Sequence, residues 1–186
     1  MKGTQVAVRY ARSLFEFALE RNELKPVYGD VVLLKRACEE SKELRRLLKS
    51  PIVQTEKKEK VIALLFTGKV SALTLGFLLL LVRKGRESFM HPIADAFVEQ
   101  YQDHSNILPV NVKTASPLSE EMRKEMLEVM KEYTDATVEL SGSVDPELIG
   151  GFILSWKDKQ YDASLSHDIE KLRRAIAKIN LYVKEI

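Results

Sequence analysis

The spacing of apolar residues changes at Asn106, and this change constrains the fold more than any other feature of the 186-residue chain. From residue 4 to about residue 103, apolar side chains recur at intervals of three and four, which is the spacing of amphipathic helices. Residues 107–115 read ILPVNVKTA, where Val110 and Val112 alternate with polar residues as in a half-buried strand. The sequence therefore predicts two domains, 1–105 and 106–186.

Capping and helix-breaking residues divide the first domain into short helices rather than long rods. Pro26, Gly68, Gly85 and the Ser50-Pro51 pair are the clearest of these signals. Six helices are predicted, near residues 4–22, 24–40, 42–49, 55–66, 70–84 and 88–103.

Helix and strand patterns alternate in the second domain. Ser119 is predicted to be the N-cap of a helix that ends near Tyr133, and the alternation at 137–140 predicts a strand. Residues 150–163 are predicted to form two strands that pair through a turn at 157–159. A last helix is expected from about 166 to 184. The predicted fold class is an N-terminal six-helix bundle followed by a smaller C-terminal α/β domain.

Composition excludes several classes of protein. With 45% hydrophobic and 30% charged residues, the chain can bury a core, which excludes a disordered polymer. The longest apolar run, Phe77 to Val82, is far shorter than the roughly 20 residues that a bilayer requires, so no direct membrane insertion is expected. Basic residues are scattered among acidic ones without interleaved aromatic residues, which disfavours nucleic acid as a partner.

Charge divides at the same boundary as the apolar spacing. Residues 1–105 carry 18 basic and 13 acidic side chains, a net charge of +5, and residues 106–186 carry 11 and 14, a net charge of −3. The two domains are therefore expected to face different partners. The densest basic cluster, Lys57-Lys58-Glu59-Lys60, is interpreted as a solvated helix surface because acidic residues are mixed into it.

No arrangement of residues in the sequence points to catalysis. His91, His104 and His167 lack the spacing of metal ligands, and the single cysteine, Cys38, has no histidine near it in the sequence. Gly150-Gly151 lacks a phosphate-binding pattern and is predicted to serve the backbone geometry of a turn or bulge. No cofactor, metal or catalytic residue is predicted. An enzyme with an unrecognised site in 106–186 stays open as an alternative.

The first predicted helix carries more apolar surface than one core can cover. At 100° per residue, its apolar side chains span an arc of roughly 220°, whereas packing on one side needs about 100° or a little more. Val6, Tyr10 and Phe17 lie along one edge of this arc, beside Ser13. The alanines of this helix point toward the middle of the arc and permit close packing.

The helix near 70–84 is apolar nearly all round, so it lies either at the centre of the bundle or against a further partner. Gly76 bears on this choice because glycine costs about 1 kcal/mol in a helix relative to alanine. Its place beside Ala72 and Leu80 suggests that another backbone approaches there, as a groove for a foreign helix would require.

Four stretches of the chain resemble a known family. They are VAVRYARSLFEFA at 6–18, VRKGRESFMHPIADAF at 82–97, TASPLSEEM at 114–122, and DPELIGGFIL with QYDASL at 145–154 and 160–165. Together they resemble the delta subunit of bacterial and chloroplast F-type ATP synthases, whose mitochondrial counterpart is the oligomycin-sensitivity-conferring protein. The resemblance covers essentially the full chain and implies the same two-domain fold.

The resemblance also implies a function and partners. Members are non-catalytic stator connectors that link the catalytic head to the peripheral stalk and resist rotation during ATP synthesis. The bundle holds the N-terminal helix of an alpha subunit between its first and fifth helices, and the C-terminal domain binds the b subunits. Matched by position, the groove residues are Tyr10, Ser13, Gly76 and Leu80, and Val6 and Phe17 lie on the same face.

The implied location is peripheral, at the cytoplasmic face of the bacterial inner membrane, or on the stromal side for a plastid protein. A helix-capturing adaptor outside the synthase would share every physical feature described above, and it stays open as the alternative function.

Overall fold

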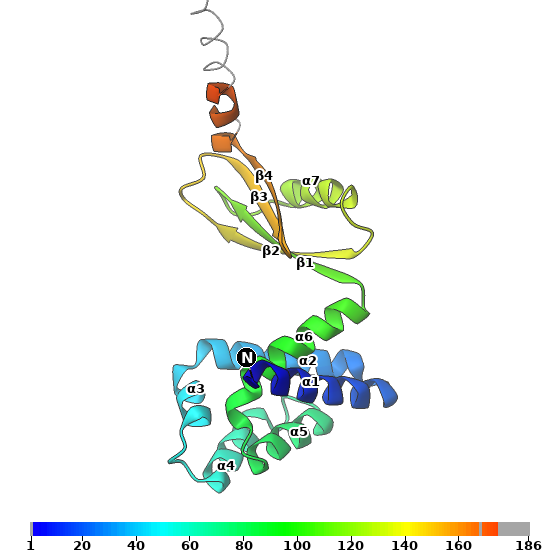
Figure 1. The fold of residues 1–186 in the computed structure, drawn as a ribbon, viewed down its shortest axis with the longest axis vertical. Coiled ribbons are helices and arrows are strands. Elements are labelled where there is room, and N and C mark those ends of the chain that lie inside the picture. The colour runs from blue at the N-terminus through cyan, green and yellow to red at the C-terminus, as the bar shows by residue number, and fades with distance from the viewer. Residues whose placement is uncertain (1, 168, 175–186) are drawn as a thin grey trace, which may run out of the picture. The chain divides into compact units, whose positions relative to one another are not determined.

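The chain divides into two compact units, Met1–Ser105 and Asn106–Ile186. The computed structural model describes residues 2–167 and 169–174. Six α-helices and one 3-10 turn make up residues 2–105 (Figure 1), which confirms the predicted helical bundle. Their bounds are α1 Lys2–Glu20, α2 Leu24–Glu40, α3 Lys42–Lys49, α4 Thr55–Phe66, α5 Ala72–Arg83, η1 Glu87–Phe89 and α6 Met90–His104.

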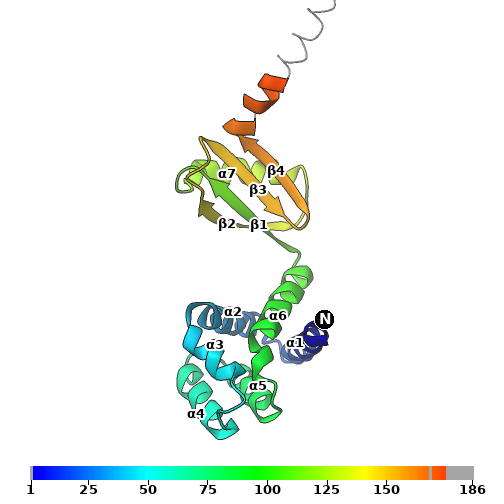
Figure 2. The same cartoon turned by 60° about the vertical axis from the view of Figure 1, so that its left-hand side comes forward.

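Helix α6 forms the centre of the first unit. Helices α1 and α2 lie on either side of it (Figure 2), and its residues Met90, Ala94 and Phe97 are fully buried. The Phe15 ring of α1 lies 5.9 Å from the Phe97 ring. The α1 alanines predicted to face the middle of the apolar arc are buried, as expected: Ala7, Ala11 and Ala18.

Helix α5 is attached to the bundle at its N-terminus and along α4. Ser71 is its N-cap, and the Ser71 side chain accepts a hydrogen bond from the Thr74 amide at 3.2 Å. The Asp30 carboxylate of α2 accepts a hydrogen bond from the Ser71 amide at 2.8 Å. These contacts explain why the helix begins at Ala72 rather than at the predicted residue 70, and they fix where α5 starts relative to α2.

The interpretation of the basic cluster on α4 as solvated surface is wrong for Lys58, which is buried. Its side chain is 4% exposed, and its Nζ donates hydrogen bonds to Glu87 Oε1 at 2.6 Å and to the Leu48 carbonyl at 3.3 Å. This buried ion pair joins α4 to η1, directly after α5. Local charge pattern could not reveal the pair, because Glu87 lies 29 residues away in the sequence.

The second unit contains a mixed four-stranded sheet within its described residues. Its elements are β1 Ile107–Thr114, α7 Glu120–Lys131, β2 Thr137–Val144, β3 Gly151–Trp156 and β4 Lys159–Ser164. The strand order is β2-β1-β3-β4; β1 pairs parallel to β2 and antiparallel to β3. Helix α7 provides the crossover that parallel neighbours require and lies on one face of the sheet (Figure 2). The predicted α/β class is confirmed.

The core of the second unit lies between α7 and one face of the sheet. Val110, Val112 and Leu154 alternate with more exposed residues along their strands, and Met126 and Met130 pack against them from α7. Gly151 has a φ of 79°, and a Cβ there would lie 2.1 Å from the Ala163 carbonyl oxygen. The predicted backbone role of this glycine is therefore confirmed.

The end of the chain is described in part. Residues 165–167 and 169–174 are helical. The remainder of the helix predicted from about 166 to 184 lies outside the described residues.

The two units are expected to fold independently, because each buries its own apolar cluster. Limited proteolysis of the full chain should cut first between residues 100 and 110, and a 1–105 fragment should unfold cooperatively in urea. Mass spectrometry of the fragments and circular dichroism measure the two outcomes. Resistance of this segment to cleavage, or a fragment without cooperative unfolding, would contradict independent folding.

Glu87→Ala is expected to lower the free energy of unfolding by about 3 kcal/mol, because it leaves the Lys58 ammonium buried without its carboxylate. Glu59→Ala is the matched control: it removes the partner of Arg83, which is 64% exposed, and should cost less than about 1 kcal/mol. Urea denaturation at pH 7 compares them. Equal losses of unfolding free energy in the two variants would show that burial does not make the Lys58–Glu87 pair more important than an exposed pair.

Candidate partner-binding groove

An open apolar groove of about 550 Å³ lies between α1 and α5. Both walls are helical, and nearly all the lining side chains are apolar. The lining residues are Tyr10, Ser13, Leu14 and Phe17 of α1, with Ala72, Leu73, Gly76, Phe77 and Leu80 of α5.

The structure brings together five of the six residues predicted to form the site: Tyr10, Ser13, Phe17, Gly76 and Leu80 line the groove. Val6 does not; it is half-buried, one helical turn before Tyr10. The prediction did not include four of the lining residues, Leu14, Ala72, Leu73 and Phe77. The all-round apolar pattern of α5 contained this signal, but it could not show which side chains face the groove.

The groove residues differ in how far their side chains are buried in the bundle. Leu14 is buried, whereas Phe17 is 45% exposed and Leu80 is 44% exposed. Tyr10, Leu73 and Phe77 are partly buried and pack against the core. The alternative of α5 as a fully central helix is therefore wrong: Leu78, Leu81 and Val82 face the interior, and its opposite side is open.

Gly76 lies on the open side of α5. A Cβ built at this residue would meet nothing within 4 Å. Among the described residues, no backbone outside α5 itself approaches Gly76, so their packing does not require glycine here. The absence of a side chain leaves open space at this point of the groove wall.

A cation lies beside the α1 wall. The Arg21 guanidinium carbon is 4.3 Å from the centroid of the Phe17 ring, within the range of a cation–π contact. The contact covers part of an exposed aromatic ring and places a positive charge next to the groove.

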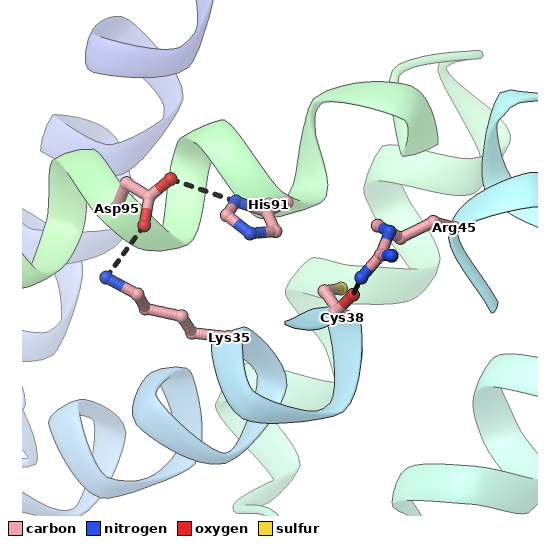
Figure 3. Close-up of polar contacts among 5 residues, drawn as sticks. All are labelled: Lys35, Cys38, Arg45, His91 and Asp95. Carbon is pink, nitrogen blue, oxygen red and sulfur yellow. Dashed lines mark hydrogen bonds and ion pairs between the residues drawn. The ribbon is translucent and has the colours of Figure 1, made fainter. Parts of the chain in front are cut away.

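Apart from the groove, a cluster of polar side chains brings together residues that are far apart in the sequence (Figure 3). His91 Nδ1 lies 2.9 Å from Asp95 Oδ2, and Lys35 Nζ lies 2.9 Å from Asp95 Oδ1. The hydrogen bond with Asp95 raises the pKa of Lys35. Cys38 and His91 line one hollow of about 290 Å³, a proximity that the sequence did not show.

The chemistry of Cys38 differs from that of a catalytic thiol. Burial raises the pKa of the Cys38 thiol to about 11, despite the opposing effect of the Arg45 charge. A catalytic cysteine requires the opposite shift. Among the described residues, no three or more His, Cys, Asp or Glu side chains could hold a metal ion together.

The fold and the groove are those of a scaffold that binds other chains rather than of a site built for a small polar substrate. A family model described as ATP synthase delta (OSCP) subunit matches residues 6–176. The chain belongs to this family. It is a non-catalytic stator component that connects the F1 head of ATP synthase to the peripheral stalk.

Individual relatives agree over nearly the whole chain. ATP synthase subunit delta of Christiangramia forsetii is 31% identical over 186 residues and covers all of both chains. The subunit of the same name from Cytophaga hutchinsonii is 35% identical over 173 residues, 93% of this chain and 94% of that one. A chain in the structure of the Toxoplasma gondii mitochondrial ATP synthase hexamer matches with a TM-score of 0.68 at 26% identity, over 92% of this chain and 97% of its own length.

The Cys38 thiol is expected to resist alkylation in the folded chain. Burial raises its pKa to about 11 and shields the side chain from solvent, so the reactive thiolate is scarce at pH 8 and the reagent cannot reach it. Iodoacetamide should modify it at the rate of a model thiol only after unfolding in urea. Mass spectrometry over time measures both rates, and rapid modification of the native chain would contradict the burial of this residue.

Proposed function

We propose that the groove between α1 and α5 binds an amphipathic helix, the N-terminal helix of an alpha subunit of the synthase. The observation that carries this proposal is that nine residues from two helices far apart in the sequence line one open apolar groove, five of them predicted from the sequence. Soluble domains rarely expose continuous apolar surface without a partner to cover it. An amphipathic helix fits such a groove by placing apolar side chains at intervals of three and four residues into it.

Partly exposed side chains are the anchors of this binding mode. Phe17 and Leu80 keep nearly half of their surface in water in the free chain, so a bound helix would remove that surface from water. Full burial of a large apolar side chain contributes about 1.5–3 kcal/mol, and half burial about half of this. Several such anchors give a slow dissociation rate, which a stator under torque requires.

The second unit is proposed to bind the b subunits of the peripheral stalk. Ile149, Ile169 and Leu172 are 72%, 47% and 63% exposed, and Ile149 and Ile169 line one hollow of about 680 Å³. Leu165, Ile169 and Leu172 follow one another at intervals of four and three residues, the spacing of one helix face. This apolar face supports a helical partner that differs from the partner of the groove.

Binding of an alpha subunit and the b subunits by one chain would transmit the counter-torque from the head to the stalk. Peripheral attachment at the cytoplasmic face of the bacterial inner membrane, or on the stromal side in a plastid, follows from these partners. Within the described residues, no helix combines the length and apolar character of a membrane span.

Leu80→Ala and Phe17→Ala are each expected to weaken binding of the alpha N-terminal peptide by roughly fourfold to tenfold, because each side chain loses only the burial that the peptide adds. Their melting temperatures should fall less than that of Leu78→Ala. Leu78 is the matched control because it lies on the same helix but is 1% exposed, so its truncation leaves a cavity that costs about 2–5 kcal/mol.

Isothermal titration with the peptide and thermal unfolding show whether Leu80 is an anchor for the peptide or a residue of the core. If Leu80→Ala lowers stability as much as Leu78→Ala does and leaves peptide affinity unchanged, Leu80 belongs to the core and the groove proposal fails.

Gly76 variants separate binding from folding more sharply. Gly76→Ala is expected to raise the free energy of unfolding by up to about 1 kcal/mol, because alanine favours the helix and its Cβ meets no other atom. Gly76→Leu should also fold, since its side chain extends into the open groove, but it should block the peptide. Stable folding together with unchanged affinity in Gly76→Leu would show that the partner does not pass over this residue.

A further inference from the structure

Helix α3 carries four cations on one face. Lys42, Arg45, Arg46 and Lys49 occupy positions i, i+3, i+4 and i+7 of this eight-residue helix, which places them in a single stripe. Together with Ser50 they line a hollow of about 430 Å³. We refer to these four residues as the α3 stripe.

The charges of the α3 stripe have no carboxylate partner among the described residues of the chain. Some cations elsewhere in the unit form ion pairs, including Lys35, Lys58 and Arg83. Arg45 instead donates hydrogen bonds to the backbone carbonyls of Cys38 and Glu39 at the end of α2. The single acid of α3, Glu43, accepts a hydrogen bond from the Ser41 hydroxyl.

Folding of α3 accounts for only part of this arrangement. Like charges three and four residues apart on a helix repel one another and lower its stability. Arg46 and Lys49 lie in the last turn, where the helix dipole favours cations, but Lys42 is the first helical residue, where the dipole disfavours them. The position of Lys42 and the mutual repulsion of the stripe are therefore not explained by the fold, and the exposed charges are available to an acidic partner.

We propose that the α3 stripe is a second docking surface, which binds an acidic segment of another subunit in the assembled synthase. The stripe extends about 10 Å along the helix axis, a length that suits a series of carboxylates better than one phosphate group. Ile52, 89% exposed in the segment that follows α3, adds an apolar contact near the end of the stripe. The unit that carries the stripe has a net charge of +5, which favours approach of an acidic partner.

The other anionic partners fit the stripe less well. A helix that lies in a lipid surface needs an apolar face for the membrane, but Leu44 and Leu48, the buried leucines of α3, face the core. Single-stranded nucleic acid requires aromatic residues for stacking, and α3 has none. Helix α3 contributes no residue to the groove between α1 and α5. The proposal for the α3 stripe is therefore independent of the proposal for the groove.

Zero-length cross-linking with a carbodiimide tests the contact directly, because the reagent joins lysine amines only to carboxylates that touch them. In purified ATP synthase containing the full chain, Lys42 or Lys49 should become linked to an Asp or Glu of another subunit. The exposed Lys57 and Lys60 of α4 are internal controls and should not link to that segment. Absence of intersubunit links at Lys42 and Lys49, while other lysines of the complex are linked, would overturn the proposal.

Charge removal provides an independent measurement. The triple variant Lys42→Gln/Arg46→Gln/Lys49→Gln retains Arg45, which caps α2. It should weaken binding of the full chain to synthase depleted of this subunit by about tenfold. Three charges are removed together because a single exposed ion pair contributes less than this. The control Lys25→Gln/Lys57→Gln/Lys60→Gln has the same net charge and should stay within about twofold of the unaltered chain. Both variants should bind the alpha peptide normally.

Three outcomes contradict the docking surface. Equal losses in the two triple variants would show a general effect of net charge. Unchanged binding of the stripe variant would show that these cations contact nothing in the complex. Binding to vesicles of phosphatidylglycerol that depends on the stripe, without any loss on the synthase, would assign the stripe to lipid headgroups instead.

Discussion

Close packing of α1 against α6 is the interaction on which the first unit depends. Small side chains make it possible: Ala7, Ala11 and Ala18 are buried in the core and allow the helix backbone to approach its neighbours. Helix α5 is held elsewhere, along α4 and by the contact of its N-cap with α2. Because α1 and α5 are attached to different helices, their facing surfaces are not filled by each other, and the groove is what remains between them.

The proposed role of the groove, to hold a partner under mechanical load, requires walls that keep their position. The N-cap at Ser71 fixes the start of α5, and the buried pair of Lys58 and Glu87 fixes the segment just after its end. A buried ion pair adds little net stability, but loss of either partner is costly, so it specifies one arrangement of α4 and η1. Rigid walls reduce the entropy lost on binding and thereby raise affinity without further contacts.

The two units of this connector offer separate surfaces to partners. Each has its own core, its own exposed apolar surface and its own net charge, so each can hold a partner without relying on the other. The cationic α3 stripe and the apolar groove lie on different helices of the first unit and suit partners of different chemistry.

The sequence by itself determined the class of fold, the six helices, the change to strands at Asn106 and the excess apolar surface of α1 and α5. These follow from periodicity and turn chemistry, which are local properties of the chain. Only the tertiary structure decided that Leu14, Leu73 and Phe77 line the groove together with Ala72, and that Val6 does not, because this depends on how two helices far apart in sequence face each other. It also decided that Lys58 is buried beside Glu87, and that Cys38 shares a hollow with His91. Burial and charge pairing are set by neighbours in space, which spacing along the chain does not encode.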